Sequence, residues 1–165
     1  MPPPPATLYF LCGKMAAGKS THAQALAQQH QAVLWVQDEL LETLYPGEIL
    51  NLGDFERCSA RLRAALGPGV QAVLHRGIDV VLDFPGNTVR QRQWFRALFE
   101  GAGAAHELHW VDASDARCKR QLRQRSAHLP PGSPWTTEAE FDAVTAFFQA
   151  PTADEGFHVV HWPRS

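Results

Sequence analysis

Short apolar runs alternate with longer amphipathic stretches along this chain. The apolar runs are rich in β-branched and aromatic residues and predict strands over residues 7–12, 32–37, 77–84, 105–112 and 157–162. Between them, apolar residues recur at helical spacing and predict helices over residues 21–30, 40–45, 54–75, 88–101, 114–128 and 137–148. Strands that alternate with helices form right-handed crossovers and a buried parallel sheet. The pattern therefore predicts a three-layer α/β fold with a mainly parallel, five-stranded sheet.

The helix predicted over residues 54–75 contains a sequence that weakens helices. Gly67-Pro68-Gly69 lies in its second half. Proline removes a main-chain hydrogen bond and clashes with the preceding turn. We therefore expect this helix to be kinked or split there. The helix over residues 88–101 has no such interruption, and Thr88 is its expected N-cap.

Composition and charge narrow the class of protein. The 165 residues, of which 45% are hydrophobic, suffice for one domain with a two-sided core. A net charge of −2 gives no broad basic surface for DNA or for a membrane. In addition, no apolar run approaches the roughly 18 residues that a membrane-spanning helix requires. The sequence thus predicts a soluble protein in which any contact with nucleic acid would have to be local.

The N-terminus and the cysteines indicate the cellular setting. Residues 1–5 begin with a polyproline run that lacks the basic and apolar parts of a signal peptide. We expect them to form a flexible extension before a single domain over residues 6–165. Cys12, Cys58 and Cys118 are odd in number and widely separated, which predicts reduced, packed thiols. These features favour a cytoplasmic protein.

A phosphate-binding motif follows the first predicted strand. Gly13-Lys14-Met15-Ala16-Ala17-Gly18-Lys19-Ser20 satisfies the Walker A pattern Gly-x-x-x-x-Gly-Lys-Ser/Thr, and Thr21 opens the predicted helix. The glycines let the main chain wrap a phosphate, towards which N–H groups at the start of the helix point. Lys19 would add a charge at the β- and γ-phosphates, and Ser20 would offer a hydroxyl ligand to Mg²⁺. We therefore predict that ATP and Mg²⁺ bind to residues 13–21.

Two carboxylates follow the next strands at the same edge of the predicted sheet, where ligands gather in open α/β folds. Asp38 ends the second strand, so its carboxylate could deprotonate the hydroxyl group that attacks the γ-phosphate. Glu39 is a weaker candidate for the same role, and Asp38 could instead cap the next helix. Asp83 closes Val80-Val81-Leu82-Asp83, which has the form of a Walker B strand and predicts a metal ligand.

Polar residues after the third strand are candidates for binding the acceptor substrate. Asn87 lies in the loop after Asp83 and can both donate and accept hydrogen bonds. Arg90 and Arg92 follow at the start of the next helix. The alternative for all three residues is a solvated turn and helix face. The loops over residues 45–55, 87–92 and 128–136 would together form the acceptor pocket, and Trp135 could stack on a base or substrate ring.

A basic helix precedes a loop rich in proline and glycine. Its cations are Arg117, Lys119, Arg120, Arg123 and Arg125. Such a helix and loop are typical of a lid that closes over phosphates and excludes water, although a solvated helix face has the same pattern. We expect a lid over about residues 117–137, in which at least one of Arg123 and Arg125 stabilises the transferring phosphoryl group. His106, His109, His158 and His161 are better explained by edge or surface positions than by a metal cluster.

With these residues in view, the chain resembles the small P-loop kinases known as AAA-type ATP-binding proteins. The resemblance covers nearly the whole chain and rests on residues 13–21, Asp38-Glu39, and residues 80–87, 118–125 and 148–157. That group is similar to chloramphenicol phosphotransferase, the zeta toxins and polynucleotide kinase, which phosphorylate a hydroxyl group of an antibiotic, a nucleotide sugar or a nucleic-acid end. It implies a P-loop NTPase fold like that of nucleotide kinases, with a small helical lid.

The resemblance also implies residue roles. Lys19, Ser20 and Thr21 would bind Mg-ATP, Asp38 would be the acceptor base, and Arg123 or Arg125 would be the lid arginine. One position departs from the pattern, because Leu41 stands where polynucleotide kinases carry an arginine three residues after the base. This departure weakens the case for a nucleic-acid acceptor.

The sequence therefore predicts an ATP-dependent phosphotransferase, a monomer or homodimer, that moves the γ-phosphate of Mg-ATP to a hydroxyl group of a small-molecule acceptor. Two alternatives remain open. One is a nucleoside, nucleotide or RNA-end kinase. The other is an ATP-binding switch or toxin–antitoxin-type partner with little turnover. Asp38 and the lid arginines favour phosphoryl transfer over switching.

Overall fold

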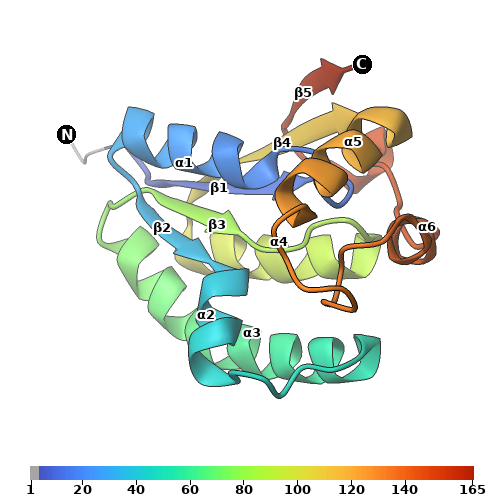
Figure 1. The fold of residues 1–165 in the computed structure, drawn as a ribbon. Coiled ribbons are helices and arrows are strands. Elements are labelled where there is room, and N and C mark those ends of the chain that lie inside the picture. The colour runs from blue at the N-terminus through green and yellow to red at the C-terminus, as the bar shows by residue number, and fades with distance from the viewer. Residues whose placement is uncertain (1–3) are drawn as a thin grey trace.

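The computed structural model describes residues 4–165, in which five parallel strands form one sheet of order β2-β3-β1-β4-β5 (Figure 1). The strands are β1 (Thr7–Cys12), β2 (Val33–Val36), β3 (Val80–Asp83), β4 (Ala105–Ala113) and β5 (Val159–Arg164). This arrangement confirms the predicted α/β class and makes the sheet wholly parallel. Residues 1–3 of the expected flexible extension lie outside the described part of the chain.

The helices fall where the apolar spacing predicts them, with shifts of a few residues at their ends. They are α1 (Lys19–His30), α2 (Gln37–Leu44), α3 (Leu52–His75), α4 (Val89–Ala102), α5 (Asp115–Ser126), α6 (Glu138–Thr145) and the 3₁₀ turn η1 (Ala153–Glu155). Thr88 caps α4 as predicted, since its side chain accepts a hydrogen bond from the N–H of Gln91. Among the described residues, no helix is long and apolar enough to cross a membrane.

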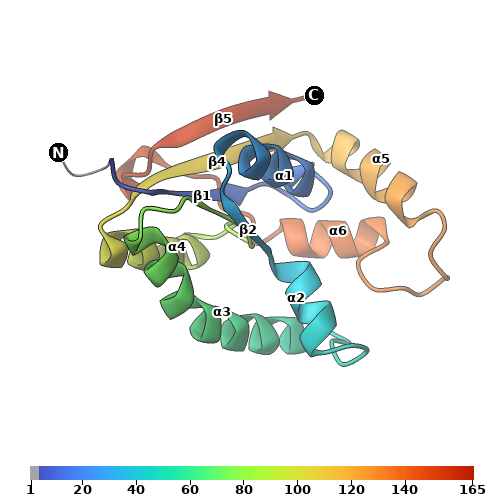
Figure 2. The same cartoon turned by 90° about the vertical axis from the view of Figure 1, so that its left-hand side faces the viewer.

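The central strand β1 supplies side chains to both faces of the sheet, because successive side chains point in opposite directions. Leu8 and Phe10 pack with the apolar sides of α3 and α4, and the ring of Phe10 stacks on that of Phe95 with centroids 4.6 Å apart. Tyr9 and Leu11 pack against α1 on the other face. Figures 1 and 2 show the resulting layers, with α1 on one side of the sheet and α3 and α4 on the other.

Helix α3 runs without a break through the sequence that was expected to kink or split it. Pro68 lies inside the helix with its ring exposed, and the helix bends along its length in Figure 2. Gly67 is buried, where a Cβ atom would lie 3.5 Å from Leu98 and 3.7 Å from Trp94 of α4. Packing against α4 therefore keeps the two halves of α3 together despite the missing hydrogen bond.

The carboxyl ends of β1, β2 and β3 bring the candidate chemistry to one edge of the sheet. The Walker A loop leaves the end of β1, and Asp38 follows β2 in the first turn of α2. Asp83 is the last residue of β3 and pairs with Val36 in the sheet register. The topology thus assembles the loop and both carboxylates at the end of the sheet where ligands bind in this class of fold.

Candidate active site

The main chain of the Walker A loop adopts a shape that only a few residue types allow. A Cβ atom at Gly13 would lie 2.6 Å from the carbonyl oxygen of Val111, so a side chain cannot be accommodated there. Ala16 and Gly18 have left-handed backbone angles, with φ of 62° and 105°. Successive main-chain N–H groups in such turns form anion-binding concavities. Gly18 is also the N-cap of α1, so the positive end of that helix faces the same space.

Lys19 lies folded over this loop. Its Nζ donates hydrogen bonds to the carbonyl oxygens of Gly13 and of Lys14, the latter at 3.0 Å. Burial lowers the pKa of Lys19, and the nearby carboxylates of Asp83 and Asp38 act in the opposite direction. The ammonium group is therefore positioned at the loop and lies within the field of both acids.

Ser20 and Asp83 form a pair that fits a magnesium ion. The Ser20 hydroxyl donates a hydrogen bond of 2.8 Å to Oδ2 of Asp83, although the two residues are 63 positions apart in sequence. Hydroxyl and carboxylate oxygens are the ligands that Mg²⁺ prefers, and it commonly takes only one or two of them from the protein. The chemistry of this donor set suits the predicted metal roles of Ser20 and Asp83.

Asp38 has an unusual electrostatic setting although its side chain is open to solvent. Partial desolvation raises the pKa of its carboxyl group most, and the charge of Asp83 raises it further. Lys19 and Arg125 act in the opposite direction. These effects place Asp38 near the two groups of the Walker site and near the lid. A raised pKa makes the ionised carboxylate a stronger proton acceptor.

The structure distinguishes the two lid arginines. Arg125 contributes to the electrostatic field at Asp38. Arg123 instead forms an ion pair with Glu138 at the start of α6. Both side chains are exposed, so both remain able to reach a ligand. Of the two arginines, Arg125 is therefore the one whose charge acts on the candidate base.

The segment that the sequence predicts as a lid packs against the Walker A loop on its inner side. Cys118 and Leu122 of α5 and Phe141 of α6 form a small buried cluster with Ala17 of the Walker A loop. Lys119 of α5 pairs with Asp142 of α6 at 3.0 Å. The basic outer face of α5 is thus carried by a helix whose inner face packs directly against the phosphate-binding loop.

Asn87 contacts the phosphate-binding loop itself. Its Oδ1 accepts a 2.8 Å hydrogen bond from the N–H of Gly13, and its own N–H donates to Oε1 of Gln91 at 2.8 Å. Gly86 before it approaches the sheet so closely that a Cβ atom would lie 2.5 Å from the carbonyl oxygen of Leu11. The Oδ1 atom of Asn87 therefore positions the Walker A loop, and acceptor binding by Asn87 stays a prediction.

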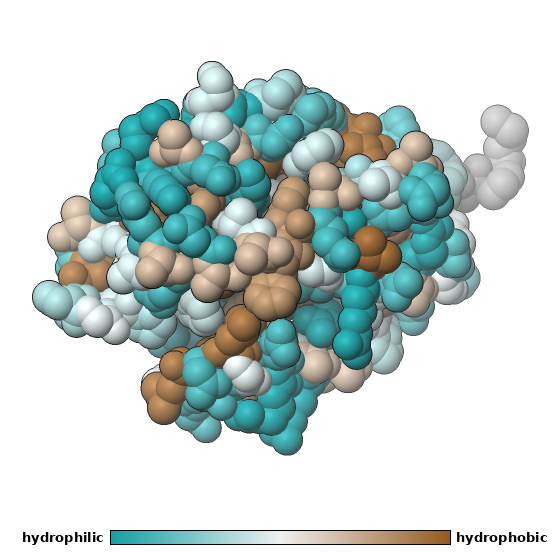
Figure 3. Space-filling model, turned by 90° about the vertical axis from the view of Figure 1, so that its right-hand side faces the viewer, coloured by the Kyte–Doolittle hydropathy of each residue, from teal (hydrophilic) through white to brown (hydrophobic). Residues whose placement is uncertain are grey.

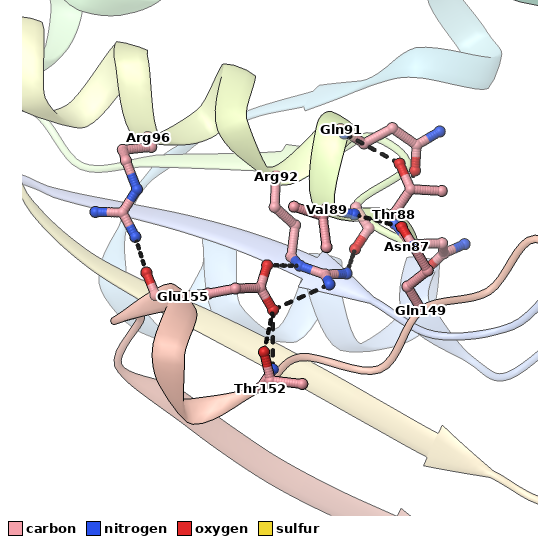
Figure 4. Close-up of polar contacts among 10 residues, drawn as sticks. Asn87, Thr88, Val89, Gln91, Arg92, Arg96, Gln149, Thr152 and Glu155 are labelled. Atoms are coloured by element: carbon pink, nitrogen blue, oxygen red, sulfur yellow. Dashed lines mark hydrogen bonds and ion pairs between the residues drawn. The ribbon is translucent and has the colours of Figure 1, made fainter.

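The expectation that Arg92 binds the acceptor is contradicted by its burial. Its side chain is fully buried, and its guanidinium donates to both carboxylate oxygens of Glu155, at 2.8 and 3.1 Å, and to the carbonyl oxygen of Gly86 at 2.9 Å (Figure 4). The N–H of Thr152 donates to the same carboxylate at 2.8 Å. Arg92 therefore joins α4, the turn after β3 and the chain around η1. Arg90 lies nearby but is exposed, beside Arg63 of α3.

The sequence-based expectation that all four histidines of β4 and the β5 region lie at edge or surface positions is wrong for one of them. His109 is only 3% exposed, and its Nδ1 accepts a 3.0 Å hydrogen bond from the indole of Trp162. Its Nε2 lies 3.0 Å from Glu107, and His22 of α1 is also in contact with the ring. Among the described residues, His, Cys, Asp and Glu side chains are nowhere grouped in threes or more as a metal site would require.

Comparisons with known proteins match this chain to one family model and to several solved structures. A family model of the AAA domain matches residues 8–151. The sequence has no match among curated proteins. A candidate kinase from Chloroflexus aurantiacus J-10-fl superposes with a TM-score of 0.74 at 19% identity, covering 96% of this chain and 88% of the other.

Two further solved structures have the same fold. The APS kinase of Mycobacterium tuberculosis, solved with AMPPNP and APS, has a TM-score of 0.65 at 19% identity and covers 99% of this chain and 92% of its own. A gluconokinase from Sinorhizobium meliloti 1021 has a TM-score of 0.62 at 16% identity, with coverages of 98% and 85%. The chain therefore has the fold of P-loop kinases, as predicted.

Proposed function

Because the chain belongs to the AAA domain family, we propose that it is an ATP-dependent phosphotransferase that moves the γ-phosphate of Mg-ATP to a hydroxyl group of a small-molecule acceptor. The observation that carries this proposal is that the Walker A loop, Asp38 and Asp83 follow the carboxyl ends of three neighbouring strands. The charges of Lys19 and Arg125 both act on Asp38. Lys19 and Asp83 suit the donor nucleotide and its metal ion. A protein that only binds ATP has no need for Asp38 or Arg125 in this arrangement.

The reaction divides among these residues as follows. The acceptor hydroxyl gives its proton to the Asp38 carboxylate as its oxygen forms a bond to the γ-phosphorus, while the bond from that phosphorus to the β–γ bridging oxygen breaks and ADP leaves. Lys19 and Arg125 stabilise the negative charge on the transferring group. Ser20 and Asp83 would hold Mg²⁺, which would supply positive charge that offsets the negative charge of the phosphates.

A small acceptor is favoured over a nucleic-acid end. Leu41 occupies the position three residues after Asp38 and is only 3% exposed in the hydrophobic core. A side chain in that position has no access to a phosphate of RNA or DNA. The net charge of −2 gives no compensating basic surface.

The proposal also covers the domain boundaries of the chain and the cellular compartment in which it works. We infer one domain over residues 6–165 with a lid over about residues 117–137, which the cluster between α5, α6 and the Walker A loop supports. Cys12, Cys58 and Cys118 are free and buried, as predicted, which suits a reducing compartment such as the cytoplasm.

Measurement of ADP release with and without a pool of small metabolites tests the proposed activity. We expect the pool to stimulate ADP release by the natural chain. Asp38→Asn should reduce the stimulated rate by about 10²–10⁴-fold, the usual contribution of a general base, while ATP binding persists. Glu39→Gln is the matched control and should keep most of the rate. Tight ATP binding with no stimulation by any pool would instead support a nucleotide-binding switch.

A further inference from the structure

A mainly apolar cavity of about 370 Å³ opens between the start of α3 and the lid. Leu50 and Leu52 form one wall, and Trp135, Val144 and Phe147 form the other. Its volume falls within the range of about 300–1,000 Å³ that is typical of small-molecule sites. Figure 3 shows apolar side chains gathered on this side of the molecule. Leu50, Leu52 and Trp135 come from two of the loops that the sequence suggested for the acceptor pocket. Val144 and Phe147 come instead from α6 and the turn after it.

Trp135 is held in this cavity by a strained main chain. Its φ of 61° is in the left-handed region, which is unfavourable for a bulky residue. The carboxylate of Glu140 maintains the turn, since it accepts hydrogen bonds from the N–H groups of Trp135 at 2.7 Å and of Thr136 and Thr137 at 3.2 Å. The indole meets the ring of Phe55 edge to face, with centroids 6.0 Å apart. Strain that is supported in this way is typical of functional positions.

The cavity lacks a partner for an anionic ligand. No lysine, arginine or histidine is among the described residues that line it. Glu140 is the one charged residue of the lining, and its carboxylate is already engaged by three main-chain N–H groups. An anion would lose its hydration there without gaining a counter-ion, which is costly. An uncharged aromatic group would gain contact with Trp135 and the leucines.

Both walls of the cavity continue from helices that carry candidate site residues, since Leu50 follows the helix of Asp38 and Trp135 follows the helix of Arg125. Arg125, which acts on Asp38, lies at the end of α5, and the loop that carries Trp135 follows it. We propose that this cavity holds the uncharged, aromatic body of the phosphate acceptor, with Trp135 as its stacking wall, so that the substrate is a neutral aromatic alcohol. This inference rests on the proposed function, because only phosphoryl transfer makes the occupant an acceptor.

Binding of 2-naphthylmethanol to the full chain, without ATP, tests the chemistry of the cavity. Isothermal titration calorimetry should give saturable binding that is about tenfold or more tighter than binding of naphthalene-2-carboxylate. Trp135→Gly should weaken it by about tenfold, although glycine tolerates the left-handed main chain and the urea midpoint should be kept. Trp135→Phe should retain most of the affinity. Leu129→Ala is the control, because Leu129 is exposed in the same loop outside the cavity lining.

Three results would overturn the proposal. One is equal or tighter binding of the carboxylate, and another is unchanged binding of the alcohol by a folded Trp135→Gly variant. The third is a dimer in sedimentation that Trp135→Gly abolishes, which would make a second copy of the chain the occupant. Parallel titration with ATP keeps the two proposals separate. Failure of ATP to bind would refute the phosphotransferase while leaving the result for the cavity intact.

Discussion

At the scale of single residues, the ionisation of Asp38 is governed by the charges that converge on it. Desolvation and Asp83 disfavour the carboxylate, whereas Lys19 and Arg125 favour it. The balance keeps the pKa of Asp38 above that of an ordinary aspartate. A carboxylate that takes a proton during phosphoryl transfer is a stronger acceptor when its pKa is raised in this way.

Removal of the Arg125 charge should raise the pKa of Asp38 further, because that charge favours the ionised form. We expect Arg125→Ala to move the titration of the Asp38 carboxyl, followed by ¹³C NMR in the free protein, to higher pH. Arg123→Ala is the matched control and should leave it in place, since Arg123 is paired with Glu138. An equal shift in both variants would contradict the assignment of Arg125 as the arginine whose charge acts on the base.

Sequence reasoning identified the loop and the two carboxylates at this scale because each is defined by its neighbours in sequence. The Walker A pattern and the strand-ending positions of Asp38 and Asp83 are local signals. The roles of Asn87 and Arg92 depend on contacts with Gly13 and Glu155, which are 74 and 63 residues away. No local pattern separates an arginine that faces solvent from one that meets a distant carboxylate.

At the scale of elements, the buried pair of Arg92 and Glu155 ties α4 to the chain around η1. Burial disfavours the ionised form of Glu155, but the hydrogen bonds from Arg92 and Thr152 outweigh it and hold the pKa of Glu155 below its ordinary value. Arg92 also holds the turn at Gly86, next to the residue that binds the Walker A loop. The pair thus supports the phosphate-binding loop from a distance.

Arg92→Met should destabilise the fold strongly, since it leaves the partly buried Glu155 carboxylate without its partner in the core. The expected loss is about 3–5 kcal/mol in the free energy of unfolding, measured with urea. Arg57→Met is the control, because Arg57 pairs with Asp54 on the surface of α3 and should contribute at most about 1 kcal/mol. A stable Arg92→Met variant with a raised KM for the acceptor would restore the predicted substrate role.

The elements themselves were predictable because apolar spacing depends on local sequence. The course of α3 was less so, since Gly67-Pro68-Gly69 indicates a break and only the contact with α4 keeps the helix continuous. The burial of His109 was missed for a similar reason. Its partners Trp162 and His22 lie on β5 and α1. The sequence of β4 alone does not predict contacts with these elements.

At the scale of the whole molecule, the contact between α1 and the sheet makes stability depend on pH. Burial lowers the pKa of His22 to about 4, and the neighbouring His109 is the next cause. An unfolded histidine titrates near about 6.5. The unfolded chain therefore binds more protons between these values, so the contribution of His22 is present above about pH 6.5 and is lost as pH falls towards 4.

The urea midpoint should accordingly fall between pH 7 and pH 4.5, and His22→Leu should make that fall smaller. His75→Leu is the control, because His75 is exposed at the end of α3. The comparison uses the slope of the urea midpoint against pH in each variant. A change in stability that is the same at every pH therefore does not affect the result. An equally steep fall in His22→Leu would show that other groups cause the acid sensitivity.

We propose that the molecule as a whole transfers a phosphoryl group between two sites at the carboxyl ends of the strands. The most direct test is ³¹P NMR of Mg-ATP incubated with the full chain and a set of neutral aromatic and aliphatic alcohols. We predict a new phosphomonoester signal that grows in step with ADP and is absent with Asp38→Asn. Release of inorganic phosphate alone, with no phosphomonoester from any alcohol, would contradict the account.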